Sequence, residues 1–370
     1  MTFSIERNDL LNVLQILSKA VPTRSTLPII SCALFTKTKN NLNIRTTDLE
    51  ISISINIKTK EEDVGSIAIP MNKLLEITTA MKEGKIDFSV SDIGKVNINS
   101  QQGHYTIMGQ ASEEFPIEQT LENGTSFNIN GKELINIINN TAYAASKDDL
   151  KPVLQGVLFQ INEEGFISVA TDGHRLVKFE KNNIQTKNYT GSIVVPTKFL
   201  TLLHNQLKEE GIEMVIGTNH VQTKIENGTI TSRIIKDPYP DYEGVIPKDN
   251  TKTLIIDKNQ FADAIKRVSI FSNKASKQVA LNISENNITI STEDPENITS
   301  GKETLECNYD GDPITIGYNA LYLKEVLQHQ SSDEIKIMLK SPLNAGLFMP
   351  MVQNDNNNKT TLLMPIRLND

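Results

Sequence analysis

The segment most suggestive of catalysis is Asp172-Gly-His174-Arg175, because an aspartate near a histidine can orient that histidine as a general base. A second possible chemistry is metal-dependent nucleic-acid hydrolysis, for which Asp48, Asp172 and Asp294 are the candidate residues. These three aspartates recur at a spacing of about 120 residues, which is the size of a domain. A residue that a reaction needs once has no reason to recur, whereas an aspartate that caps the same strand-end turn does. We therefore expect three turn caps, and a metal-dependent nuclease stays the alternative.

The other signatures of catalysis are missing from the sequence. It contains no P-loop, no G-x-S-x-G elbow, no H-E-x-x-H pair and no cluster of histidines. Its two cysteines, Cys32 and Cys307, cannot supply a four-ligand zinc site or a disulfide framework. We therefore expect no catalytic residue, no metal and no cofactor.

Composition limits the class of protein. The 370 residues carry 37 basic and 45 acidic side chains, a net charge of −8, and 38% of them are apolar. That apolar share is enough for ordinary globular cores. No stretch approaches about 18 consecutive apolar residues, and the first residues lack the pattern of a secretory signal. We expect a soluble cytoplasmic protein with no membrane contact.

The elements that must position these residues occur three times along the chain. A short alternating strand runs into an amphipathic helix at Phe3–Leu10, again at Phe127–Leu134 and again at Leu254–Phe261. The helices begin at Glu6, Asn130 and Asp257, of which the last two resemble capping boxes. The period of about 124 residues is too long for a solenoid unit and matches a whole domain.

Two further landmarks repeat in the same order. A strand that ends at Pro or Gly precedes a second helix at Gly65–Pro70, Gly191–Pro196 and Asp312–Gly317, and another strand follows each helix. The residues between these landmarks alternate as antiparallel strands, for example from Leu49 to Ile57. We therefore predict an α+β protein of three tandem domains, each with two helices packed on antiparallel sheets, at residues 1–122, 125–247 and 252–370.

Five motifs span the whole chain in order: Arg24-Ser-Thr-Leu-Pro-Ile29, Thr46-Thr-Asp-Leu-Glu50, Ala170-Thr-Asp-Gly-His-Arg-Leu176, Pro238-Tyr-Pro-Asp-Tyr242 and Met364-Pro-Ile-Arg-Leu368. With these motifs the chain resembles the bacterial β sliding clamps, the processivity subunits (β subunits) of the replicative DNA polymerase III. The resemblance implies three copies of a DNA-clamp domain, a head-to-tail homodimer that closes into a ring around duplex DNA, and no enzymatic activity of its own. Any polymerase or exonuclease activity would belong to partner subunits.

The resemblance also implies partners and site residues. The partners would be duplex DNA of any sequence, a second copy of the chain, the replicative polymerase alpha subunit, the clamp loader, and other polymerases or repair proteins that carry a clamp-binding peptide. DNA contacts are expected at Arg24, Lys73, Lys147 and Lys198. A dimer seam is expected between Lys73 and Tyr105 of one chain and Ile270 and Phe271 of the other.

A pocket for the partner peptide is expected at the junction of the second and third domains, where Gly173 to Leu176 and the last motif both break the repeat. By the resemblance, the pocket and its neighbouring groove consist of Leu154, Thr171, Gly173, His174, Arg175, Leu176, Pro240, Val245, Tyr322, Leu362, Met364, Ile366 and Arg367. Leu, Val and Met side chains make an adaptable slot for partner Leu and Phe residues.

The sequence departs from the family pattern in places that affect these expectations. Gly244 stands where an Arg is common, Pro152-Val153 replaces aromatic residues that some relatives place against DNA, and Asn72 replaces a basic residue. Two physical arguments nevertheless favour a ring that slides on DNA. A repeated domain can continue one contact into a partner chain, and an acidic chain avoids a tight basic groove. A repetitive scaffold that binds no DNA is the third possibility.

Overall fold

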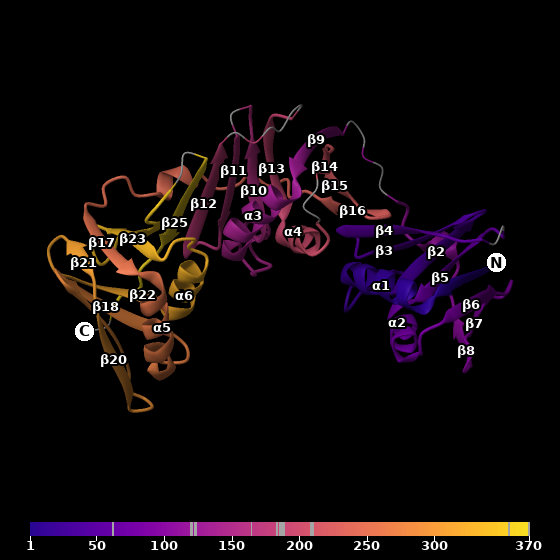
Figure 1. Cartoon of the computed structure of the whole chain (residues 1–370), viewed down its shortest axis with the longest axis horizontal. Helices are drawn as coiled ribbons and strands as arrows, with labels where there is room; N and C mark the ends of the chain where they lie inside the picture. The colour runs from indigo at the N-terminus through magenta and orange to yellow at the C-terminus, as the bar shows by residue number, and fades with distance from the viewer. Residues whose placement is uncertain are drawn as a thin grey trace. The chain divides into compact units, whose positions relative to one another are not determined.

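The structure is a computed structural model of the whole chain (Figure 1). It describes residues 1–60, 63–118, 121, 124–163, 165–182, 184, 189–207, 211–353 and 356–368. No helix in these ranges is long and apolar enough to cross a membrane.

The predicted threefold repeat is confirmed, because the same order of strands and helices occurs three times. The first copy consists of β1 (Thr2–Glu6), α1 (Arg7–Leu17), β2 (Cys32–Thr38), β3 (Asn41–Thr47), β4 (Ile51–Lys58), β5 (Gly65–Pro70), α2 (Met71–Ala80), β6 (Lys85–Val90), β7 (Lys95–Asn99) and β8 (His104–Met108). The second consists of β9 (Thr125–Asn130), α3 (Gly131–Thr141), β10 (Gly156–Ile161), β11 (Gly165–Thr171), β12 (Arg175–Asn182), β13 (Gly191–Pro196), α4 (Thr197–His204), β14 (Gly211–Ile216), β15 (His220–Ile225) and β16 (Gly228–Arg233).

The third copy has the same order with one short extra strand. It consists of β17 (Lys252–Asp257), α5 (Lys258–Val268), β18 (Gln278–Ser284), β19 (Asn287–Asp294), β20 (Thr299–Glu306), the extra strand β21 (Asn308–Asp310), β22 (Ile314–Asn319), α6 (Ala320–Gln328), β23 (Glu334–Leu339), β24 (Gly346–Pro350) and β25 (Asn357–Leu363). Each copy is therefore a two-helix α+β unit, as the sequence predicts.

The helices bury the apolar stripe that the sequence predicts. Leu10, Leu14 and Leu17 are fully buried on α1, and Phe261, Ile265 and Val268 are buried on α5. The α5 cap also agrees with prediction, because Asp257 Oδ1 accepts a hydrogen bond from the Gln260 N–H at 2.8 Å. Glu6, the weak cap of α1, makes no such bond. The helices are thus held by burial first and by capping second.

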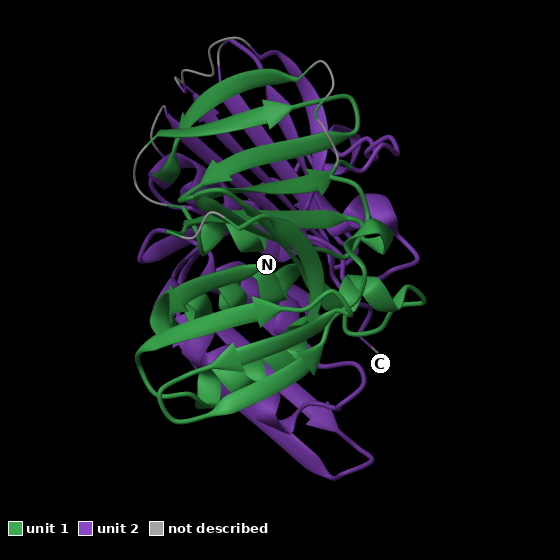
Figure 2. Ribbon diagram, turned by 90° about the vertical axis from the view of Figure 1, so that its right-hand side faces the viewer, with its two compact units in different colours: residues 1–131, 201–234 green, residues 132–200, 235–370 purple. Residues whose placement is uncertain are grey.

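The described chain forms two compact units (Figure 2). The first unit contains Met1–Gly131 and Thr201–Ile234, and the second contains Lys132–Leu200 and Ile235–Asp370. The division passes through the predicted second domain, because strands of that domain join a sheet in each unit. The domain boundaries at 1–122, 125–247 and 252–370 therefore stay a prediction.

Each unit holds two antiparallel sheets. In the first unit they run in the order β1-β6-β7-β8 and β5-β2-β3-β4-β16-β15-β14-β9. In the second they run in the order β20-β19-β18-β22 and β13-β10-β11-β12-β25-β24-β23-β17-β21. The two large sheets arise from equivalent joints, in which the last strand of one copy pairs with the fourth strand of the copy before it: β16 with β4, and β25 with β12.

Two boundaries in the sequence analysis are wrong. The strand expected at Asp312–Gly317 is β22, which begins at Ile314 and continues to Asn319. The alternation that starts at Leu49 predicts a strand from that residue, but β4 begins at Ile51. Leu49 lies in the preceding turn with a left-handed φ of 77° and a 40% exposed side chain. The turn geometry thus overrides a pattern that extends one apolar residue too far.

Candidate functional site

The three recurring aspartates are turn caps, as predicted. Each carboxylate accepts backbone N–H bonds from residues two or three positions further along, at 2.7 to 3.2 Å: Asp48 from Glu50 and Ile51, Asp172 from His174 and Arg175, and Asp294 from Glu296. Across the residues that the structure describes, no three His, Cys, Asp or Glu side chains are grouped so that they could hold a metal ion. These aspartates therefore serve the fold, and the nuclease alternative has no support from their geometry.

Arg175 is the centre of a buried ion-pair network at the start of β12. It is 5% exposed, and its Nε lies 3.2 Å from Asp172 Oδ2 while its Nη1 lies 2.5 Å from Glu325 Oε2 on α6. Its Nη2 donates to the Tyr143 carbonyl oxygen at 2.8 Å, and the guanidinium lies 4.9 Å from the centre of the Tyr322 ring. Since its nitrogens are used inside the protein, Arg175 supports the site rather than offering donors to a ligand.

The strands β12 and β25 bring the two non-repeating motifs together. Leu176 pairs with Leu362 in register, and the Met364 N–H donates to the His174 carbonyl oxygen at 2.8 Å. Leu176 is 2% exposed and Leu362 is 3% exposed. Both belong to an apolar cluster with Leu158, Val169, Val194, Tyr242, Ala345 and Leu347. The predicted meeting of these segments is confirmed, and it creates an apolar floor.

Four other residues of the predicted pocket are more accessible than Leu176 and Leu362. Val245 is 57% exposed and Met364 is 43% exposed, and Pro240 is also exposed. Leu154 is half-buried in a short 3-10 helix, Pro152–Gln155. A site for a Leu- or Phe-bearing peptide needs both accessible apolar side chains and a buried apolar base, and the predicted residues include both kinds.

The turn between β11 and β12 owes its shape to two further residues of the predicted pocket. Gly173 has a left-handed φ of 91°, a conformation that favours glycine. The Thr171 hydroxyl donates to the Arg175 carbonyl oxygen at 2.6 Å and accepts the Gly173 N–H at 3.1 Å. Both residues therefore shape the turn.

A groove of about 630 Å³ lies beside this turn, between it, α6 and residues 145–151. His174 and Tyr322 line it and stack on each other, with ring centres 5.6 Å apart. Lys147, expected at DNA, lines the same groove. The other two predicted groove residues lie on the segment after β25: the Ile366 N–H donates to the Gly317 carbonyl oxygen at 2.9 Å, and Arg367 is exposed.

Several residues of this site were not found from the sequence. Tyr143 and Glu325 contact Arg175, and Lys359 contacts Tyr143 in turn. Tyr242 belongs to one of the five motifs but was not assigned to the site, and it packs in the same cluster as Leu176 and Leu362. One signal was available for Glu325, because it lies three positions after Tyr322 and so on the same face of α6. Tyr143 and Lys359 follow no motif.

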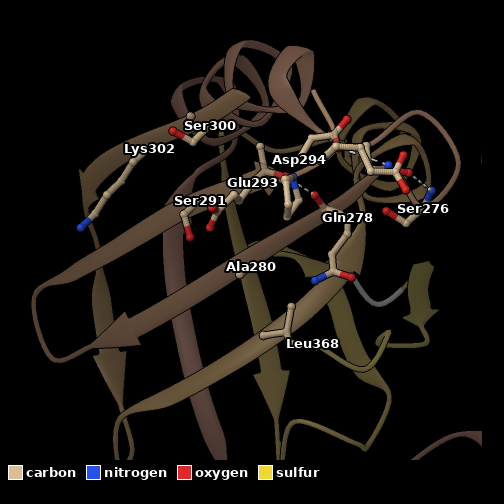
Figure 3. Close-up of a pocket in the computed structure, with 14 residues that line it drawn as sticks. Ser276, Gln278, Ala280, Ser291, Glu293, Asp294, Ser300, Lys302 and Leu368 are labelled. Carbon is tan, nitrogen blue, oxygen red and sulfur yellow. Dashed lines mark hydrogen bonds between the residues drawn. The ribbon is translucent and has the colours of Figure 1, made fainter. Parts of the chain in front are cut away.

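The third copy of the same turn is polar, which distinguishes it from the pocket. It borders a hollow of about 870 Å³ on β18, β19 and β20 (Figure 3). The residue before the capping Asp is Thr171 in the second copy, where it pairs with Leu176. In the third copy it is Glu293, which pairs with Ser300. Ser291, Glu293 and Lys302 also line the hollow. An apolar floor is thus a property of the second copy and is not shared by the third.

The residues expected at DNA are all on the surface. Arg24 and Lys73 are exposed in the first unit, and Lys147 and Lys198 are exposed in the second. Lys73 lies 3.1 Å from Glu76 one turn along α2, which partly neutralises it. Their role in DNA contact stays a prediction.

Three of the four residues expected at the dimer seam lie on or beside two outermost strands, whereas Lys73 lies on α2. Tyr105 is half-buried on β8, which ends one four-stranded sheet. Ile270 and Phe271, 75% and 42% exposed, lie in a 3-10 helix, Ser269–Phe271, next to β20, which ends the other. The position of a Cβ at Gly301 on β20 is 3.0 Å from Phe271 Cδ2. Two exposed apolar side chains therefore flank the free edge of β20.

Comparison with known proteins identifies the family. The chain matches the family models of the three DNA polymerase III beta subunit domains in order. The N-terminal domain matches residues 1–120, the central domain residues 128–241 and the C-terminal domain residues 243–367. The beta sliding clamp of Pseudomonas aeruginosa is 28% identical over 372 residues, and that of Vibrio cholerae is 27% identical over 371 residues. Each alignment covers 100% of both chains.

Solved structures agree with this result. The crystal structure of the DNA polymerase III subunit beta from Pseudomonas aeruginosa has a TM-score of 0.91 at 27% identity and covers 100% of both chains. A sliding clamp from the same species bound to griselimycin has a TM-score of 0.90 at 27% identity, again over 100% of both chains. The matches in sequence and in fold run the full length of the chain and include every motif discussed above. The chain therefore belongs to the DNA polymerase III beta subunit family, the beta sliding clamps.

Proposed function

We propose that two copies of this chain join head to tail into a ring around duplex DNA and tether the replicative polymerase to it. As a member of the beta sliding clamp family, the chain is a non-catalytic processivity factor of DNA polymerase III. The observation that carries the ring is a strand joint that occurs twice within the chain and can occur a third time between two chains.

The repeated joint defines which strands would meet at the seam. Within the chain, β16 pairs with β4 and β25 pairs with β12, both antiparallel. In the order of the repeat, β8 corresponds to β16 and β25, and β20 corresponds to β4 and β12. Both β8 and β20 are outermost strands of their sheets, and an unpaired strand edge is a template for another chain. The third joint would therefore pair β20 with β8 of a second copy, and a heterologous contact of this kind can close into a ring.

The register of this third joint follows from the other two. Ile230 faces Ile53 in the first joint, and Thr361 faces Val177 in the second. When the strand pairings of the three copies are compared residue by residue, Tyr105 occupies the position of Ile230 and Thr361. In the same comparison Gly301 occupies the position of Ile53 and Val177. Tyr105 of the partner subunit would thus face Gly301.

This register brings apolar groups together at the seam. Facing residues of an antiparallel pair point to the same side of the sheet, so Tyr105 of the partner subunit would project toward the side on which Phe271 approaches Gly301. Ile270, the neighbour of Phe271, would be covered at the same time. Tyr105, Ile270 and Phe271, three of the four seam residues expected from the sequence, are consistent with this arrangement.

DNA binding by such a ring would rest on encirclement and weak phosphate contacts. Arg24, Lys73, Lys147 and Lys198 are exposed and can contact phosphates of any sequence. The net charge of −8 opposes tight binding along the surface. A ring that slides along DNA requires weak phosphate contacts together with encirclement.

Partners would dock where β12 and β25 meet. The buried Leu176 and Leu362 and the exposed Val245 and Met364 would together receive the apolar residues of a clamp-binding peptide. That peptide would come from the polymerase alpha subunit, the clamp loader, or other polymerases and repair proteins. Because residue 244 is Gly, the docking site lacks the Arg side chain that is common at this position in the family. We also propose that the protein works in the cytoplasm, where bacterial DNA is replicated.

Retention on DNA tests the proposal. A purified chain loaded on nicked circular DNA should stay bound through gel filtration at high salt, and cutting the circle should release it. Equal loss from circular and linear DNA would contradict encirclement. DNA degradation that requires magnesium and disappears in Asp172→Asn would instead support the nuclease.

A further inference from the structure

A buried lysine is connected by side-chain contacts to the groove beside the β11–β12 turn. Lys359, on β25, is 3% exposed. Its Nζ donates to Asn140 Oδ1 on α3 at 3.0 Å and to the carbonyl oxygen of His329, the residue after α6. Both acceptors are uncharged, and burial lowers the pKa of Lys359 to about 7. One side chain of the sheet thus ties two helices together at a considerable desolvation cost.

An aromatic ring connects this lysine to Arg175. Tyr143 lies just beyond α3, in the 3-10 helix Ala142–Ala144. Its ring stacks on the His329 ring, with centres 3.7 Å apart and planes 9° apart. Lys359 Nζ is 5.7 Å from the centre of the Tyr143 ring, and the Arg175 guanidinium is 5.3 Å from it. Both distances are within the range of a cation–π contact.

Arg175 in turn contacts the side chains that line the groove. It binds Asp172 and Glu325 and packs on the Tyr322 ring, and Tyr322 stacks on His174. All of these residues line the groove. A continuous series of contacts therefore runs from Lys359 through Tyr143 and Arg175 to the walls of the groove.

We propose that Lys359 is a positioning residue for partner-peptide binding: its ammonium fixes α3 and the end of α6 on either side of Tyr143 and so holds His174 and Tyr322 in place. The inference rests on the proposed docking of partner peptides at this junction. A groove whose walls are fixed in advance loses less entropy on binding, so its affinity is higher. Deprotonation removes the charge from both hydrogen bonds and from the ring contact, which loosens the walls.

The charge state of Lys359 should therefore control affinity near neutral pH. The titratable and charged groups around it are Tyr143, His329, Arg175 and, beyond Arg175, Glu325. Burial raises the pKa of Tyr143 and lowers the pKa of His329, so both are neutral above about pH 6.5. The Arg175 guanidinium stays charged. Lys359 is then the group among these whose charge changes around pH 7.

The test measures binding of a fluorescein-labelled peptide carrying Leu and Phe to the full chain by anisotropy, from about pH 6 to about pH 8.5. For the unmodified protein we expect the dissociation constant to rise about fivefold with pH, with a midpoint near 7. Lys359→Met should show the weaker value at every pH. Asn140→Asp places a carboxylate beside the ammonium and should move the midpoint upward by one pH unit or more.

Lys181→Met is the matched control. Lys181 lies on β12 and pairs with Glu133 of α3, so it also ties the sheet to that helix, but it does not contact Tyr143. Its pH profile should match that of the unmodified protein. A profile without a step near pH 7, or equal binding by Lys359→Met at pH 6, overturns the inference. If Lys359→Met does not fold, an unmoved midpoint in Asn140→Asp overturns it. Absence of peptide binding by the unmodified protein at every pH would instead refute the docking site itself.

Discussion

The seam can be tested by replacing the two exposed apolar residues beside β20. Ile270→Ala combined with Phe271→Asp removes side chains that are 75% and 42% exposed in the single chain. If the partner covers them, each seam buries about 200 Å² of their apolar surface, worth about 5 kcal/mol at 25 cal/mol per Å². Alanine retains part of this area, so the loss is about 3 kcal/mol per seam before the cost of burying the Asp charge is added.

A ring has two such seams, and both must open before the two chains separate. The expected loss is therefore about 6 kcal/mol, which raises the dimer dissociation constant about 10⁴-fold. Sedimentation equilibrium should detect monomers at concentrations where the unmodified protein is dimeric. Leu343→Asp is the control, because Leu343 is 64% exposed in the same domain but belongs to another loop. A double variant that folds, as shown by its thermal unfolding, and still sediments as a dimer would refute the proposed seam.

Three other predictions concern the pocket, the buried lysine and DNA. Met364→Ala, at a 43% exposed position, should weaken peptide binding about tenfold and lower the free energy of urea unfolding by less than about 1 kcal/mol. Leu176→Ala, at a 2% exposed position, should weaken binding and also cost about 2–4 kcal/mol of stability. The pKa of Lys359 is about 7 in the folded state and 10.5 in the unfolded state, so the unfolded state binds more protons between these pH values. The stability of the protein relative to Lys359→Met should therefore rise by up to about 1.4 kcal/mol per pH unit from pH 7 to pH 9. A constant difference would show that the lysine does not titrate there. Arg24→Ala should weaken binding to linear duplexes of every sequence alike and reduce the salt slope by about one, and a sequence-selective loss in filter binding would contradict a phosphate contact.

The fold was largely predictable because its determinants are local and occur three times. The apolar stripes of α1 and α5 and the caps at Asp48, Asp172 and Asp294 depend on residues within a few positions of each other. Leu49 shows the limit of this reasoning, because a left-handed φ leaves no trace in an alternating pattern.

The candidate site was predictable only in part. The pairing of Leu176 with Leu362 agrees with the expected junction of the two motifs. Arg175 was expected to line the pocket and lies at the groove, but its sequence context does not show that Glu325, far along the chain, binds its guanidinium. The contacts of Lys359 with Asn140 and Tyr143 join residues about 200 positions apart, and no local rule connects them.

The shared sheets have a consequence for attempts to produce single domains. A fragment that ends at residue 122 would lose β16, which covers the edge of β4 in the eight-stranded sheet. The strand left bare, Ile51–Lys58, carries Ile at every second position through Ile57, and an exposed apolar edge of this kind promotes aggregation. A fragment made for expression should therefore keep β14 to β16 with the first domain, or carry Lys at outward-facing positions of β4. The unit that can be isolated from this protein is set by its sheets and is larger than its sequence repeat.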